Sequence, residues 1–134
     1  MRCDPHSGFP VATNECPDPD PETGWLTAPS EQLTLKPFRT MVNDAEGKAY
    51  AGEHGADFPF LDDYFDAPDG ASHPVRLAPG TVCTGIIVVG YREPLMDHVV
   101  SCADLVEVAA GRRVPVAVWS TGDTTVQLSE LYRP

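Results

Sequence analysis

The chain has 134 residues, enough for one domain with a hydrophobic core but too few to favour two. Its formal net charge of −11 argues against nucleic acid and anionic membrane surfaces as partners, because both require a basic footprint. No apolar run approaches the roughly 18 residues of a membrane span. The 14 prolines and 11 glycines predict many turns between short strands.

The first part of the chain, residues 1–30, is predicted to be a loop extension. Proline and acid alternate through residues 16–22, which removes backbone donors and disfavours a helix or an inner strand. Trp25 and Leu26 are expected to anchor this segment to the rest of the protein. We therefore divide the chain into an extension over residues 1–30, looped by a disulfide between Cys3 and Cys16, and a single β-sandwich domain over residues 31–134.

Alternating apolar residues predict a strand over residues 32–41, with Pro37 at an edge or a bulge. A turn is expected next, over residues 43–47, with Gly47 at a position of positive φ. Residues 48–51 then begin a short return strand.

A long irregular section is predicted over residues 52–74. Its aromatic residues have two interpretations, a plug at the open end of the core, which we favour, or an exposed binding patch. The candidate binding residues are Phe58, Phe60, Tyr64 and Phe65.

Carboxylates and histidines in this section suggest two further kinds of site. Acids at Asp62, Asp63, Asp66 and Asp69 suggest a calcium loop, although their spacing differs from that of an EF-hand and solvated surface acids are the default interpretation. The same default holds for Asp18, Asp20 and Glu22. A pocket joining His54 and His73 to this acidic cluster would indicate a hydrolase.

The clearest strand signal covers residues 81–90, after a predicted turn at Pro79-Gly80. If the chain turns at residues 91–94, paired residue numbers sum to 185 and Cys83 lies opposite Cys102. The same register pairs Gly85 with Val100, Ile87 with His98 and Val89 with Met96, so that one face is apolar apart from His98. A helix over residues 94–111 is the alternative, since Pro94 suits a first turn and Gly111 a C-terminal cap. We favour the strand.

The cysteines indicate an exported protein. Four is an even number, and local geometry favours the pairs Cys3–Cys16 and Cys83–Cys102 over four free thiols. There is no Cys-x-x-Cys motif, and histidines lack metal-ligand spacing. No apolar leader precedes Cys3, which leaves either a cytosolic protein or an exported one whose leader is absent from this sequence. The four cysteines favour the second, so we expect a secreted or cell-surface protein.

The C-terminal part predicts a hairpin, with strands over residues 114–120 and 124–131 joined by a turn at Gly122-Asp123. Short strands with turn signals at close intervals indicate an all-β protein. We predict a disulfide-stapled, immunoglobulin-like antiparallel β-sandwich with a long N-terminal loop segment.

Two turn motifs add a family resemblance. They are Asn43-Asp44-Ala45-Glu46-Gly47-Lys48-Ala49-Tyr50, and Leu77-Ala78-Pro79-Gly80 continuing through Gly85-Ile86-Ile87. Over residues 32–90 the chain resembles the telokin-like, immunoglobulin-type domain of secreted actinobacterial antigens and lipoproteins. The resemblance implies export, a β-sandwich and no established catalytic activity.

Motifs for chemistry are sparse. The sequence has no Gly-x-Ser-x-Gly, no phosphate loop and no dinucleotide fingerprint, and His98 is expected to be structural. We predict no cofactor and no metal. The predicted function is an exported, non-enzymatic module that binds a protein or a cell-envelope component. The alternative is a secreted hydrolase, or a calcium-stabilised module, that uses the Asp and His residues of the 52–74 section.

Overall fold

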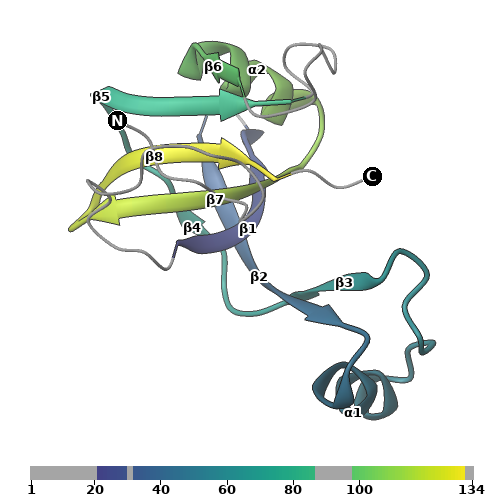
Figure 1. Ribbon diagram of the computed structural model, residues 1–134. Coiled ribbons are helices and arrows are strands. Elements are labelled where there is room, and N and C mark those ends of the chain that lie inside the picture. Colours follow the sequence, from purple (N-terminus) through teal and green to yellow (C-terminus); the bar gives the residue numbers. More distant parts are fainter. Residues whose placement is uncertain (1–20, 30–31, 87–97, 132–134) are drawn as a thin grey trace.

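The computed structural model describes residues 21–29, 32–86 and 98–131, in which strands dominate and two helices are added (Figure 1). The strands of these residues form one eight-stranded sheet in the order β3-β2-β1-β7-β8-β5-β6, and β4 pairs with β2. The elements are β1 (Glu22–Thr27), β2 (Thr34–Val42), α1 (Ala45–His54), β3 (Tyr64–Pro68), β4 (His73–Pro74), β5 (Leu77–Gly85), β6 (His98–Val100), α2 (Cys102–Gly111), β7 (Val114–Thr121) and β8 (Thr124–Glu130). Neither helix has the length and apolar character needed to cross a membrane.

The main core lies between the sheet and α2. Strand β7 contributes Val114, Val116 and Val118 to this core, in the alternating pattern of a strand with one face turned inward. From α2, Leu105 and Ala109 reach the same core and are fully or almost fully buried. Burial of this apolar surface is the main force that holds the helix against the sheet.

Strand β1 corrects the prediction that residues 1–30 form only a loop. It lies between β2 and β7 and pairs with both, which places Glu22–Thr27 inside the sheet. The strand begins directly after Pro21, where the block of prolines ends. The expected anchors are confirmed, because Leu26 is fully buried and the ring of Trp25 lies 4.8 Å from that of Phe38.

Strand β2 is confirmed and belongs to two ladders. Its first half pairs with β1 and its second half with β3. Pro37 pairs with Gly24 at the end of the first ladder, and its carbonyl accepts a hydrogen bond from the Asp69 amide (2.9 Å) where the second begins. The residue without an amide hydrogen therefore sits where one ladder gives way to the other.

Residues 38–69 form a projection that we call the arm. It consists of the second half of β2, then α1, a connecting loop and β3, and Figure 1 shows it extending away from the rest of the sheet. The arm has a small core of its own, formed by Met41, Ala51, Phe60 and Ala67.

The return strand predicted for residues 48–51 is wrong, because they belong to α1. Asp44 caps the helix by accepting a hydrogen bond from the Gly47 amide (2.8 Å), and Gly55 ends it with φ 65°. Gly47 is helical and is absent from the glycines of positive φ. It is required for space, since a Cβ there would lie 1.9 Å from the carbonyl oxygen of Val42.

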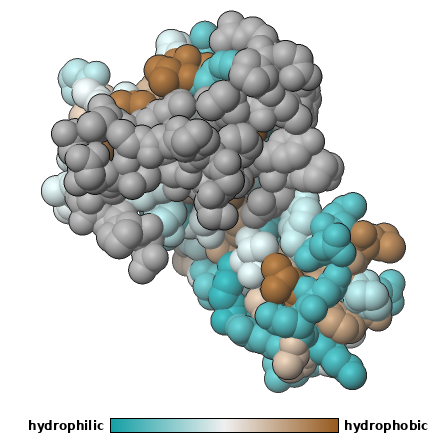
Figure 2. All heavy atoms as spheres, viewed as in Figure 1, coloured by the Kyte–Doolittle hydropathy of each residue, from teal (hydrophilic) through white to brown (hydrophobic). Residues whose placement is uncertain are grey.

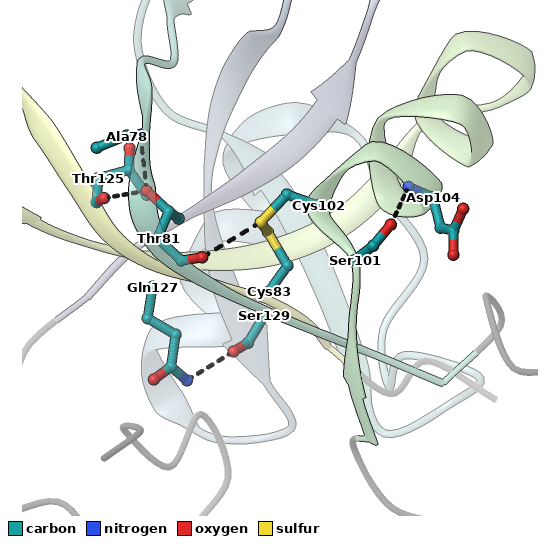
Figure 3. The surroundings of a disulfide bond; sticks show 9 residues. All are labelled: Ala78, Thr81, Cys83, Ser101, Cys102, Asp104, Thr125, Gln127 and Ser129. Atoms are coloured by element: carbon teal, nitrogen blue, oxygen red, sulfur yellow. Dashed lines mark hydrogen bonds between the residues drawn. A yellow bond between two sulfur atoms is a disulfide. The ribbon is translucent and has the colours of Figure 1, made fainter.

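The Cys83–Cys102 disulfide is confirmed, but the register that predicted it is wrong. Its Cα atoms are 5.2 Å apart, and it joins β5 to the first residue of α2 (Figure 3). Cys83 pairs with Val100 and Gly85 with His98, so paired numbers sum to 183.

The short strand β6 explains this difference in register. The second strand of the expected hairpin ends at Val100, and a helix begins at Cys102. The alternative interpretation, a helix over residues 94–111, is therefore right from Cys102 onward and wrong for His98–Val100. Ser101 starts the helix by accepting a hydrogen bond from the Asp104 amide (3.0 Å). The turn at residues 91–94 and the pair formed by residues 89 and 96 lie outside the described residues.

The predicted turn at Pro79-Gly80 is wrong as well, because both residues lie within β5. The ladder between β5 and β8 is irregular there, and Thr81 bridges the irregularity. Its hydroxyl accepts from the Ala78 amide (2.8 Å) and donates to the Thr125 carbonyl (2.7 Å). The hairpin of β7 and β8 is confirmed, with Gly122 at φ 59°.

The predicted fold class is confirmed at its coarser level, as a mostly β protein with a disulfide. The sheet also contains one parallel pair, β5 with β8, which corrects the expectation of a wholly antiparallel arrangement. The described strands join in one sheet, and the two packed sheets of an immunoglobulin-like sandwich are not confirmed. The predicted Cys3–Cys16 pair lies outside the described residues.

Candidate functional site

A row of aromatic rings runs through the arm. Consecutive ring centroids are 5.5 Å apart from Phe58 to Phe60, 5.6 Å from Phe60 to Phe65, 5.9 Å from Phe65 to Tyr50 and 4.0 Å from Tyr50 to His54. These distances lie at or below the separations typical of interacting aromatic pairs. We call these five residues the aromatic row.

The row is assembled from three elements. Tyr50 and His54 are one helical turn apart on α1 and therefore share a face. Phe65 comes from β3, and Phe58 and Phe60 come from the loop between α1 and β3. The three segments follow one another within residues 50–65, and the row forms because α1 lies beside β3 across the loop.

Asn43 holds the loop in position. Its side-chain oxygen accepts a hydrogen bond from the Phe60 amide (2.7 Å), and its side-chain nitrogen lies 3.3 Å from the Phe60 carbonyl. The same nitrogen lies 3.4 Å from a carboxylate oxygen of Asp63, which has φ 66°. The Asn43 side chain therefore satisfies both the backbone amide and the backbone carbonyl of Phe60, whose ring fills the arm's core.

The row is partly buried and partly exposed. Phe60 is 7% exposed and fills the arm's core, whereas Phe58 and Phe65 are 37% and 38% exposed. Leu61, at the turn after Phe60, is fully exposed. The space-filling view shows hydrophobic surface among hydrophilic residues on the arm (Figure 2). Phe60 is thus a core residue of the arm, and an exposed binding patch at Phe58 and Phe65 stays a prediction.

Tyr64, the fourth candidate, is not part of the row. Side chains alternate along a strand, so Tyr64 and Phe65 leave β3 on opposite faces. Tyr64 borders an open hollow of about 670 Å³ that is also lined by Phe65 of the row and by Asp62, Trp25 and Arg113. The Arg113 guanidinium lies 4.4 Å from the centroid of the Trp25 ring, a cation–π contact.

The acidic residues of the arm do not gather into a metal site. Within the described residues, no group of three or more His, Cys, Asp or Glu side chains is arranged to hold a metal ion. Asp66 accepts a hydrogen bond from the Thr40 hydroxyl (2.7 Å), and Asp63 contacts Asn43. These contacts give the two carboxylates structural roles.

His73 belongs to a different environment from His54. Its Nε2 lies 2.9 and 3.0 Å from the two carboxylate oxygens of Glu22, and its Nδ1 lies 3.1 Å from the Pro74 carbonyl. The hydrogen bond to Glu22 raises the pKa of the His73 imidazole, the Pro74 carbonyl raises it further, and desolvation opposes both. Only the imidazolium form donates from both nitrogens, so this geometry leaves no ring nitrogen to act as a general base.

The predicted pocket is found only in part among the described residues, because a hollow of about 640 Å³ joins His73 to Asp69 of the acidic cluster but does not include His54. His73 borders a hollow of about 400 Å³ together with Glu22, Ser120 and Asp123. His54 is instead stacked on Tyr50 in the arm. A hydrolase site built from this set of residues lacks its central geometry.

The sequence did not point to Tyr50, Leu61 and Asn43, and it pointed to His54 only as part of a hydrolase pocket. A signal for Tyr50 and His54 exists, since Asp44 followed three residues later by Gly47 is compatible with a capped helix that would place residues 50 and 54 on one face. No local pattern indicates that Asn43 bonds the backbone of a residue 17 positions away.

Comparison of the chain with protein-family models, with curated proteins and with solved structures finds no match.

Proposed function

We propose that this protein is an exported, non-enzymatic binding module, and that the exposed part of the aromatic row, together with Leu61, is its contact site. The observation that carries the proposal is that the projecting arm exposes Leu61 fully and exposes Phe58 and Phe65, which are nearby in sequence, by more than a third. Aromatic residues are enriched at protein interfaces, where they supply large contact areas. The partner is a protein or a cell-envelope component.

Binding is favoured over catalysis by the state of the histidines. His73 is engaged at both ring nitrogens, whereas His54 is stacked on Tyr50 in the arm. The hydrolase hypothesis requires both histidines beside the acidic cluster, because a general base must lie within reach of the proton that it removes. The alternatives, a secreted hydrolase or a calcium-stabilised module, therefore receive less support.

Export is supported by the disulfide. Disulfides persist in oxidising compartments, and the Cys83–Cys102 bond ties α2 to the sheet beside the main core. A secreted or cell-surface location follows as part of the proposal. The resemblance to telokin-like, immunoglobulin-type domains of actinobacterial cell envelopes stays a prediction.

A photo-crosslinking experiment tests the contact site. A benzophenone amino acid is placed at Leu61, and the oxidised protein is incubated with the envelope fraction of its own source before irradiation. Since the side chain at this position is fully exposed, the replacement leaves the arm's core intact. We expect one discrete crosslinked species.

The matched control carries the same amino acid at Val99, which is 67% exposed on β6 and lies outside the arm. Crosslinking from this position is expected to be weak and diffuse. The proposal fails if Leu61 yields no discrete species, or if Val99 yields the same one with equal efficiency.

A further inference from the structure

The arm carries a concentration of negative charge around its exposed rings. Residues 38–69 contain eight acidic residues against two basic ones, a formal charge of −6 within a chain whose total is −11. Three of these acids flank the exposed residues directly in sequence: Asp57 precedes Phe58, and Asp62 and Asp63 follow Leu61. One of the two basic residues, Arg39, is already paired with Glu46 at 3.0 Å. From outside the arm, Arg112 and Arg113 line the same hollow as Phe65 and Asp62.

Aromatic faces and carboxylates together favour one kind of side chain. A guanidinium stacks on aromatic rings, is weakly hydrated and pairs with carboxylates in a planar geometry. An ammonium is a compact, strongly hydrated charge that gains less from the rings. The contact of Arg113 with Trp25 is an example within this same protein.

We propose that the arm binds an arginine-bearing segment of a partner protein. In this arrangement guanidinium groups stack on the exposed faces of Phe58 and Phe65, and Asp57 and Asp62 neutralise their charge. The inference rests on the proposed function and narrows it to the chemistry of the partner. It also agrees with the negative net charge, which disfavours nucleic acid and anionic membranes as occupants.

The test uses two fluorescent peptides of equal length and charge, one rich in arginine and one rich in lysine. Their affinities for the oxidised full chain are measured by fluorescence anisotropy. We expect the arginine peptide to bind more tightly, by at most about two- to fivefold for each ring that it engages. Added salt should weaken both peptides, because their attraction to the carboxylates is screened.

Two sets of variants separate the rings from the charge. Phe58→Leu and Phe65→Leu keep apolar bulk but remove the ring. The ratio of the arginine-peptide affinity to the lysine-peptide affinity should therefore fall toward one, with little change in the affinity of the lysine peptide. Asp57→Asn with Asp62→Asn should weaken both peptides. Asp123→Asn, which changes an exposed acid on the β7–β8 turn, is the control for charge outside the arm.

Equal affinity for the two peptides would overturn the inference, as would an arginine preference that survives both phenylalanine substitutions. A loss no greater in the arm's double Asn variant than in the Asp123→Asn control would also overturn it. Circular dichroism confirms that each variant is folded, and Phe58→Leu, outside the strands, is the safer of the two ring variants. If crosslinking from Leu61 succeeds while arginine shows no preference, the proposed function stands and this inference alone fails.

Discussion

Removing the Cys83–Cys102 disulfide should cost this protein a large part of its stability. The bond closes a loop across a sequence separation of 19. In the chain-entropy model this restricts the unfolded chain by about 11 cal/mol/K, which is ~3 kcal/mol at room temperature. Domains of this size have total stabilities of about 5–15 kcal/mol, so the loss is substantial.

The variant Cys83→Ala/Cys102→Ala is compared with the oxidised parent by equilibrium urea unfolding. Cys83 is almost fully buried, so a packing contribution must be separated from the entropy of the crosslink. The comparison is made in a Cys3→Ala/Cys16→Ala background, whose reduced form keeps both sulfur atoms of this bond and opens no other. We expect the oxidised parent to exceed the reduced one by ~3 kcal/mol and the double variant to be weaker still.

The location of the bond adds a second expectation. Because the disulfide attaches the start of α2 to β5, reduction should expose the amides of α2 to hydrogen exchange before those of the β7–β8 hairpin. A stability difference below about 1 kcal/mol between the oxidised and reduced parent would refute the reasoning. So would equal loss of protection in α2 and in the hairpin.

Three further predictions concern the arm and the ion pair of His73 with Glu22. Gly47→Ala should destabilise the arm, because the added Cβ would lie 1.9 Å from a backbone oxygen. Gly52→Ala, in the same helix but facing open space, should stabilise the protein by about 0.5–1 kcal/mol. Thermal unfolding compares the two variants, and equal shifts in Tm would contradict the packing argument. Asn43→Ala should lower stability by about 1–3 kcal/mol, because it leaves the amide and the carbonyl of Phe60 unpaired. Hydrogen exchange should then become faster in the arm and not elsewhere, and unchanged protection of the Phe60 amide would refute the prediction. The contact with Glu22 raises the pKa of His73 in the folded protein. The stabilisation that this contact gives is therefore present below pH 6.5 and is lost as the pH rises through the pKa of His73 in the folded state. His73→Gln should flatten the dependence of stability on pH, and an NMR titration showing a lowered His73 pKa would contradict the prediction.

The sequence alone predicted features whose signals are local. The β7–β8 hairpin follows from alternating apolar residues on either side of Gly122, and β2 follows from the same alternation. The even number of cysteines led to the correct disulfide, although the register behind it was displaced by two residues. The prediction of the disulfide was still correct because Cys102, the first residue of α2, lies beside β5 with its Cα atom 5.2 Å from that of Cys83.

For the candidate site, the sequence identified the right segment but not its form. Phe58, Phe60 and Phe65 were selected because they stand together in an acidic loop, and the structure does bring these three together. It separates Tyr64 from them, since strand β3 directs alternate side chains to opposite faces. That separation depends on the loop becoming a strand at residue 64.

Local periodicity and turn residues therefore determined the β-rich class and the β7–β8 hairpin, because each depends on neighbours along the chain, and the cysteine count indicated the crosslink without its correct register. Only the tertiary structure decided that Glu22–Thr27 enters the sheet, since its hydrogen bonds go to β2 and β7 rather than to nearby residues. The same holds for the aromatic row. It needs α1 where a strand was expected, and Asn43 to fix a loop 17 residues away, contacts that no local pattern encodes.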